Sequence, residues 1–436
     1  MPHYSWVIES AEMKSNSQFS DTFRVKSGNK LRAGGGILLL ACAVLAPVVL
    51  SQALSSPELN RDQPPPSAYA GDSACAQCHR KQAVSYAFTS HARDSAPASA
   101  GHILGSFLPG SDVLHTSDPN LVVNMTHGPD GFYQNAVNLS DPQKHLTERF
   151  DIVIGSGRHG QSYLFWNDDQ LYELPASYWA PDHAWIISPG FPDGQVHFDR
   201  PVEPRCLECH TSYFHWVPPD INRFAKTGIV YGINCERCHG PGAEHVAREH
   251  AAASRQGARQ APADLAIVNP AHLSRDRQID LCSLCHAGAV DARRAPLTFQ
   301  AGDNIDDYLA IQPPTPGETV DVHGNQVGAM KLSRCFTSSN MTCSTCHDVH
   351  ERPASAESYS RHCLACHQMQ TCGRYPVLGQ AIRTKCVDCH MPLGESDKIV
   401  STTGGHTLRM LARTHQIAIY PDVSVRVEQS LTQKFR

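Results

Sequence analysis

One pentapeptide pattern, Cys-x-x-Cys-His, occurs seven times in this chain of 436 residues and takes up 14 of its 17 cysteines. A chain of this length can build a hydrophobic core without disulfide crosslinks, so its cysteines indicate a cofactor. The thiols of the seven copies are Cys75, Cys78, Cys206, Cys209, Cys235, Cys238, Cys282, Cys285, Cys343, Cys346, Cys363, Cys366, Cys386 and Cys389. The histidines that follow them are His79, His210, His239, His286, His347, His367 and His390.

The spacing of this pattern has a chemical reason. Two thiols separated by two residues can add to the two vinyl groups of one haem, and the next histidine then becomes the proximal iron ligand. Zinc is an alternative, but structural zinc needs four ligands and gives no reason for a histidine after every second cysteine. Disulfides leave the histidines unexplained as well. The sequence therefore predicts seven covalently attached haem c groups.

The charge balance bears on the partners of the chain. Lys and Arg number 37 against 42 Asp and Glu, which gives a net charge of −5. Nucleic-acid binding depends on a basic excess that this chain lacks, so no nucleic-acid partner is expected.

The N-terminal part of the chain predicts export. A polar leader, 1–32, carries basic residues just before an apolar run at 33–54. This order places the leader inside and the rest in the periplasm or elsewhere outside the cytoplasmic membrane, with 33–54 either a cleaved signal peptide or a retained membrane anchor. Cys42 lies in the apolar run and is interpreted as a thiol without a role in the cofactor sites. A Pro-rich tether follows at 55–68.

The exported body divides by the spacing of the motifs. Its expected parts are a first-haem region with a β-containing insertion at 69–205, a three-haem cluster at 206–290, a loop-rich spacer at 291–334 and a C-terminal three-haem cluster at 335–436. Residues 242–259 are expected to form a helix. The last three motifs start only 20 and 23 residues apart, so their haems must pack against one another and form a conduit for electrons.

The expected fold class is mainly α, with irregular loops around stacked haems and a small β-containing segment near 130–200. Within that segment, 161–166 and 170–174 flank Asn167-Asp168-Asp169 and predict a hairpin. The same segment contains Trp166, Trp179 and Trp185. This cluster of large aromatic residues predicts that the segment is the one region with a conventional packed core.

Several stretches resemble the multihaem c-type cytochromes with paired attachment motifs, a group that includes the tetrahaem electron carrier of ammonia-oxidising bacteria and pentahaem and octahaem nitrogen-compound enzymes. The resemblance is carried by Phe88-Thr89-Ser90-His91, by His239-Gly240-Pro241-Gly242-Ala243-Glu244-His245, by Cys343 to His350 and by Cys386 to Pro392. It implies a helical fold around the haems, a place outside the cytoplasmic membrane, and either electron transfer or reduction of small inorganic species.

The sixth iron ligand decides the chemistry, because a haem ligated on both faces moves electrons while an open face can bind substrate. The 25 histidines far exceed the seven proximal positions, so mostly His/His coordination is expected. The resemblance supports His91, His245 and His350 as distal ligands. Further candidates are His406, His159, His323, His415 and His362. The sequence pairs none of them with a particular haem.

Two other cysteines, Cys335 and Cys372, lie in the last haem cluster. In an oxidising compartment they could form a disulfide, and the alternative is two unpaired thiols. The sequence leaves both open.

Two functions are compatible with these features. The first is an exported heptahaem electron carrier that exchanges electrons with redox partner proteins. A membrane quinol-oxidising complex is one such partner, because the anchor and tether would hold the carrier close to it. The second is an oxidoreductase that acts on a small nitrogen or sulfur species at one five-coordinate haem. For this alternative, Arg158, His159 and Tyr163 are candidate pocket residues.

Overall fold

The computed structural model describes residues 63–254, 266–288, 290–313 and 324–433. The predicted leader, the apolar run at 33–54 with Cys42, the first part of the tether and His323 lie outside these residues. Among the helices that the structure describes, each is too short or too polar to cross a membrane.

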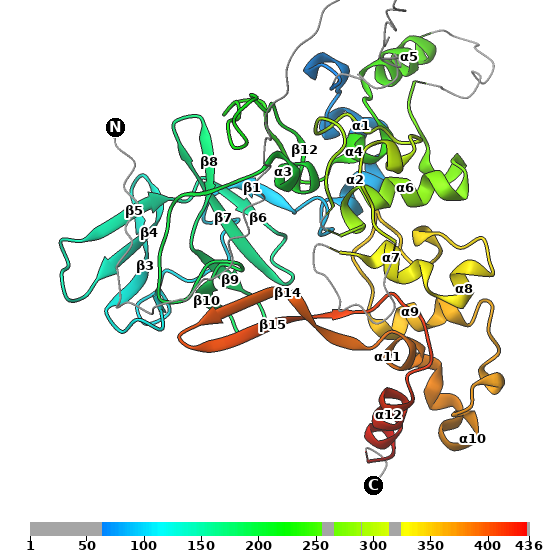
Figure 1. Cartoon of the computed structure of the whole chain (residues 1–436). Helices are drawn as coiled ribbons and strands as arrows, with labels where there is room; N and C mark the ends of the chain where they lie inside the picture. Colours follow the sequence, from blue (N-terminus) through cyan, green and yellow to red (C-terminus); the bar gives the residue numbers. More distant parts are fainter. Residues whose placement is uncertain (1–62, 255–265, 289, 314–323, 434–436) are drawn as a thin grey trace, which may run out of the picture. The chain divides into compact units, whose positions relative to one another are not determined.

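Strands are a main component of the fold (Figure 1). They are β1 Ser95–Pro97, β2 Val113–His115, β3 Leu121–Gly128, β4 Gly131–Asn138, β5 His145–Arg149, β6 Ile152–Ile154, β7 Gly160–Asn167, β8 Gln170–Glu173, β9 Ala176–Trp179, β10 Ala184–Ile187, β11 Arg200–Pro201, β12 Thr211–Tyr213, β13 Val230–Tyr231, β14 Leu393–Thr403 and β15 His406–Arg413. Within the described residues they form a seven-stranded sheet, a four-stranded sheet and two two-stranded sheets. The predicted mainly α class, with only a small β segment near 130–200, is therefore wrong.

The four-stranded sheet has the order β2-β3-β4-β5, and its first two strands precede the predicted β segment. Its central hairpin pairs Gly128 with Gly131 across Pro129-Asp130, a two-residue turn. Val123 and Met125, two residues apart on β3, are both buried, as expected for one face of a strand.

The larger sheet contains the hairpin that the sequence predicts. Strand β7 pairs with β8 so that Asn167 faces Gln170, which leaves Asp168 and Asp169 as the turn. Asp168 has a φ of 50°, in the left-handed region that short hairpin turns require. This prediction is confirmed.

The helices are short, and several of them contain an attachment motif or end at one. They are α1 Asp72–Cys78, α2 Arg80–Tyr86, α3 Pro204–His210, α4 Cys235–His239, α5 Ala243–Ala253, α6 Arg275–His286, α7 Gln326–Lys331, α8 Arg334–Thr337, α9 Ala356–Cys363, α10 Tyr375–Leu378, α11 Cys386–His390 and α12 Pro421–Gln433, with a 3-10 turn, η5, at Cys343–Thr345. The helix expected at 242–259 is present over Ala243–Ala253 as α5, and residues 255–259 lie outside the described part of the chain. Helices this short are marginal alone, so packing and cofactor attachment must stabilise them.

The hydrophobic core is divided. Trp185 belongs to the largest cluster with Tyr163 and Phe150, whereas Trp166 packs on a second cluster and Trp179 belongs to a third. Smaller clusters also form outside the β region, for example around Phe299. The three tryptophans therefore do not form one cluster, and the β region is not the only part with a packed core.

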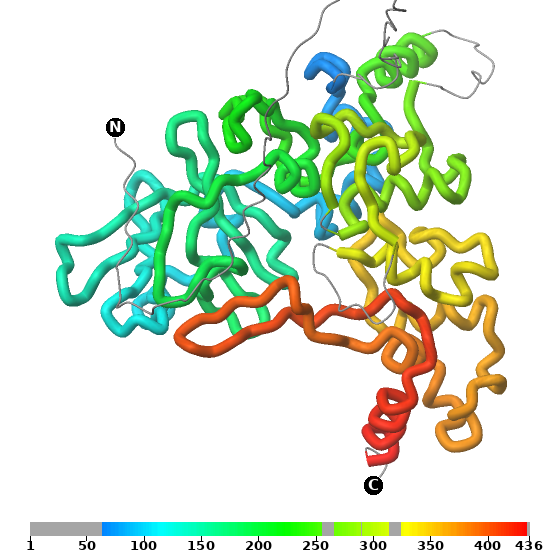
Figure 2. The backbone as a smooth tube through the Cα atoms, viewed as in Figure 1, coloured from blue at the N-terminus to red at the C-terminus, as the bar shows by residue number. Residues whose placement is uncertain are grey.

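The C-terminal hairpin connects the last motif to the β region. The chain runs from α11 into β14 and β15, which lie beside β10 (Figure 2). Ile187 N donates to Thr403 Oγ1 at 2.9 Å, and Ser401 Oγ donates to Ile187 O at 2.7 Å. Met410 packs on Trp179 in the same contact.

Candidate haem-binding site

Most attachment motifs coincide with one turn of helix. Helices α4 and α11 each consist of one whole motif, and α3 and α6 end at the histidine of theirs. Residues i, i+3 and i+4 share one face of a helix, so this conformation points both thiols and the imidazole of a motif to the same side.

All 14 motif cysteines and all seven motif histidines border one continuous cavity of about 3550 Å³. A pocket for one small ligand has a volume of roughly 300–1,000 Å³. The cavity is therefore large enough for several large groups side by side, and its donors, thiols and imidazoles, are those that covalent haem requires. The residues present fit the predicted cofactor.

Several of the motif imidazoles are held through their Nδ1 atoms. Nδ1 of His239 donates to Val268 O at 2.8 Å, and Nδ1 of His390 donates to Ala418 O at 2.7 Å. A carbonyl oxygen only accepts, so these bonds fix the tautomer in which Nε2 has a lone pair for a metal.

Two further motif histidines have side-chain partners at the same atom. Nδ1 of His286 lies 3.3 Å from Oε1 of Gln326, and Nδ1 of His347 lies 3.2 Å from the Tyr359 hydroxyl. Both partners are neutral. The amide oxygen of Gln326 accepts from Nδ1 and leaves Nε2 of His286 with its lone pair, whereas the Tyr359 hydroxyl can act as donor or acceptor.

His210 differs from these four because its partner is charged. Its Nδ1 lies 2.8 Å from Oδ2 of Asp94. Burial alone would lower the pKa of His210, but the charge and hydrogen bond of Asp94 raise it.

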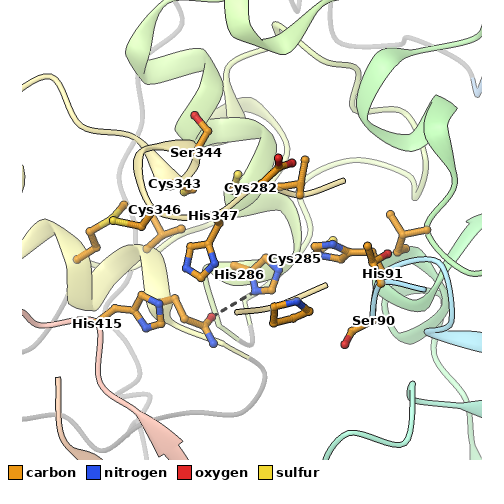
Figure 3. Close-up of a pocket in the computed structure, with 18 of the residues that line it drawn as sticks. Ser90, His91, Cys282, Cys285, His286, Cys343, Ser344, Cys346, His347 and His415 are labelled. Atoms are coloured by element: carbon orange, nitrogen blue, oxygen red, sulfur yellow. Dashed lines mark hydrogen bonds between the residues drawn. The ribbon is translucent and has the colours of Figure 1, made fainter. Parts of the chain in front are cut away.

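Three motif histidines face a second histidine across the cavity. The pairs, with their ring-centroid separations, are His91 and His286 at 6.0 Å, His239 and His350 at 6.2 Å, and His347 and His415 at 6.2 Å. Figure 3 shows the rings of the first and third pairs in succession along the cavity. Two imidazoles that share one metal, each with a metal–nitrogen distance of about 2 Å and about 1 Å from nitrogen to ring centre, have centroids about 6 Å apart.

Partial burial keeps several of these imidazoles neutral. It lowers the pKa of His91 and His286, and it lowers the pKa of His415 to about 4. The neutral imidazole is the form that ligates a metal.

The structure places the other candidate distal ligands differently. His245 and His159 border the cavity, as does His362. His406 is exposed at the β14–β15 turn and lies outside the residues that border the cavity. His415, which has no motif signal of its own, takes a facing position through the segment that follows β15.

The residues between the motif cysteines tie the motifs together. Glu236, inside the third motif, accepts hydrogen bonds from Ala70 N at 2.8 Å and Gly71 N at 2.9 Å, just before α1. In return, Asp72 accepts from Cys235 N at 3.1 Å. The first and third motifs are therefore fixed to each other by buried polar contacts.

Glu208, inside the second motif, has a similar role. It is buried, and it accepts from Arg205 at 2.6 Å and from Leu297 N at 2.9 Å. Sequence reasoning missed both glutamates, because nothing in the pattern distinguishes a structural residue at these variable positions from a solvent-exposed one.

Thiols of different motifs also approach one another. The pairs within hydrogen-bonding reach are Cys75 and Cys235, Cys209 and Cys285, Cys282 and Cys343, and Cys363 and Cys386. The first motif thus adjoins the third, the second adjoins the fourth, the fourth adjoins the fifth and the sixth adjoins the seventh.

Cys335 and Cys372 are free thiols. Cys335 lies near Cys346, and Cys372 lies near Cys389, so each adjoins a different motif.

The candidate pocket residues divide into two groups. Arg158 and His159 border the cavity from the loop between β6 and β7. Tyr163 is fully buried in the largest core cluster, where its hydroxyl donates to Gln161 Oε1 at 3.1 Å, so it does not serve as a pocket residue. Two glycines of this loop adopt backbone conformations that other residues rarely adopt: Gly155 has a φ of 96° and Gly157 a φ of 82°.

Comparison with known proteins agrees with the cofactor chemistry. Residues 192–240, which contain the second and third motifs, match the family described as cytochrome c554 and c-prime. This match confirms the predicted resemblance to multihaem c-type cytochromes. No curated protein matches the chain.

Two solved structures are similar to the chain. One is the outer cell wall cytochrome OcwA, with 16% identity and a TM-score of 0.48 over 83% of this chain and 82% of that chain. The other is the undecaheme cytochrome from the S-layer of Carboxydothermus ferrireducens, with 16% identity and a TM-score of 0.39 over 83% of this chain and 53% of that chain.

Proposed function

We propose that this chain, which is a multihaem c-type cytochrome with covalently bound haem c, holds seven haems and carries electrons along them. Each motif would attach one haem through its two cysteines and ligate the iron through its histidine. The observation that carries the proposal is the set of three histidine pairs whose rings lie 6.0 to 6.2 Å apart, the separation that one shared iron requires.

The facing histidines support a proposal of distal ligands for three haems. His91 would ligate the iron of the motif that ends at His286, and His350 that of the motif that ends at His239. His415 would ligate the iron of the motif that ends at His347. When bound, the haems supply one-electron redox chemistry at iron, and two strong-field imidazoles favour transfer over substrate binding.

The packing of the motifs supports a conduit. The second, fourth and fifth motifs form a contiguous series through their thiols, and so do the sixth and seventh. The fifth motif is also linked to the third, because His350 lies three residues after His347 and faces His239. Such contacts place neighbouring haems close together.

The N-terminal sequence supports a place for the protein outside the cytoplasm. The basic leader and the apolar run at 33–54 have the order of a signal peptide or membrane anchor. We therefore infer export to the periplasm or cell surface, with 33–54 as signal peptide or anchor, and redox proteins as partners, among them a membrane quinol-oxidising complex.

One observation favours the second candidate function, an oxidoreductase for a small nitrogen or sulfur species. Arg158 and His159 form a polar edge on the cavity, where they could contact an anionic substrate at an open haem face.

Electron paramagnetic resonance of the matured ferric protein tests these functions. The electron carrier predicts mainly low-spin haem signals that nitrite, hydroxylamine and cyanide leave unchanged. A high-spin signal that shifts with one of these ligands would instead support the oxidoreductase.

A further inference from the structure

We propose that Asp94 is a positioning residue for the haem attached through Cys206 and Cys209, and that it lowers the reduction potential of this haem relative to the haems whose histidines contact neutral acceptors, His239, His286, His347 and His390. This inference rests on the proposed function. It starts from the 2.8 Å contact between Asp94 Oδ2 and His210 Nδ1.

The acceptor at His210 differs in charge from the other acceptors. His239 and His390 donate to backbone carbonyls, while His286 and His347 lie against an amide and a hydroxyl. A carboxylate accepts a stronger hydrogen bond than a neutral oxygen does and shifts electron density toward Nε2. A more basic axial ligand, with a negative charge beside it, stabilises the oxidised iron and lowers the reduction potential.

Hydrogen bonds of Asp94 and of the next residue fix the position of the Asp94 backbone. Gly155 N donates to Asp94 O at 2.6 Å. The next residue, Ser95, donates through Oγ to His210 O at 2.6 Å and accepts from Gly232 N at 2.9 Å. These hydrogen bonds hold β1 against α3, and they therefore keep Asp94 next to His210.

The same segment serves a second site. His91, three residues before Asp94, faces His286, and Asp94 N donates to His91 O at 3.2 Å. The motifs of His210 and His286 also adjoin through Cys209 and Cys285. The segment from His91 to Asp94 therefore supplies both the ring that faces His286 and the carboxylate that contacts His210.

Glu173 adds to the effect of Asp94. Its charge also raises the pKa of His210, while Arg200 lies 3.3 Å from Glu173 and offsets part of that charge. Because Asp94 contacts the imidazole directly, we assign the larger influence to it.

The test is a spectroelectrochemical titration of the full matured chain with Asp94→Asn. Asparagine keeps an acceptor but removes the charge, so one component of the titration should move to higher potential, while Asp94→Glu should restore most of the wild-type value. Asp182→Asn, which removes an exposed carboxylate from the same β region, is the matched control and should change nothing. A titration of Asp94→Asn in which every component stays in place, with the haem content unchanged, would overturn the inference.

A reciprocal variant covers the case in which Asp94→Asn does not mature. Gln326→Glu introduces a carboxylate at the Nδ1 contact of His286, so it should lower one component, and no movement of any component would contradict the inference. Failure of the proposed function is a separate result: it appears in the mass of the wild-type protein as fewer than seven haems, whatever the potentials.

Discussion

The imidazole rings of His347 and His415 lie 6.2 Å apart, centroid to centroid, with only 24° between their planes. His347 belongs to an attachment motif, and His415 follows strand β15. Their facing arrangement joins two segments that are far apart in sequence, and it supports the proposal that His415, which no local pattern marks, is a distal ligand.

Replacing His415 should open one haem face. His415→Ala removes the ring opposite His347, so one haem should change from low-spin to high-spin in the ferric protein. Paramagnetic resonance measures this change, and His406→Ala, at an exposed turn, is the control that should leave the spectrum unchanged. An unaltered spectrum in His415→Ala would show that the ring is not an iron ligand.

Replacing His91 tests the pair in which His91 and His286 lie 6.0 Å apart. His91→Met keeps a ligand of adequate length on the distal side but substitutes a thioether, which raises the potential of the haem relative to His/His ligation. One component of the redox titration should therefore shift upward, with the haem content unchanged. If every component stays in place, His91 does not ligate the iron.

The buried carboxylate of Glu236 should matter to stability. Glu236→Gln replaces an acceptor oxygen with a donor amide facing the Ala70 or Gly71 amide, which we expect to cost about 1–3 kcal/mol. Urea unfolding of the matured protein measures the loss. Glu244→Gln removes an exposed helix ion pair with Arg248 and should cost only about 0.5 kcal/mol or less. Equal stability of the two variants would contradict the role of Glu236.

Gly155 should not tolerate a side chain. It has a φ of 96°, and a Cβ there would lie 2.8 Å from Gly160 O. Gly155→Ala should therefore lower the free energy of unfolding by roughly 1–3 kcal/mol, whereas Gly101→Ala, which meets nothing closer than 3.9 Å, should have little effect. A loss in the Gly101 variant as large as that in the Gly155 variant would argue against backbone strain as the cause.

The sequence predicts the cofactor chemistry far better than the fold. The pattern around Cys206 or Cys386 encodes a complete attachment site within five residues, because helical geometry alone brings its side chains together. The hairpin around Asp168 was predictable for a similar reason: its turn and alternation are local.

The β-rich architecture was harder to predict from the sequence. The seven attachment motifs favoured a mainly helical class, and this expectation outweighed the local signals for strands. The Pro129-Asp130 turn joins β3, which precedes the predicted β segment near 130–200, to β4, which lies inside that segment. Gly404 and Gly405, with φ values of 57° and 79°, form the β14–β15 turn and explain why His406 is exposed. The position of His415 depends on how that hairpin returns to the haem sites, and tertiary packing of this kind has no local signature.

The central claim is that each of the seven motifs attaches one haem. Intact-mass measurement of the chain, produced in a host with haem-attachment machinery and extracted with acid and acetone, tests it most directly. The account predicts the polypeptide mass plus seven haem increments. A mass with fewer than seven increments, or the bare polypeptide mass, would contradict it.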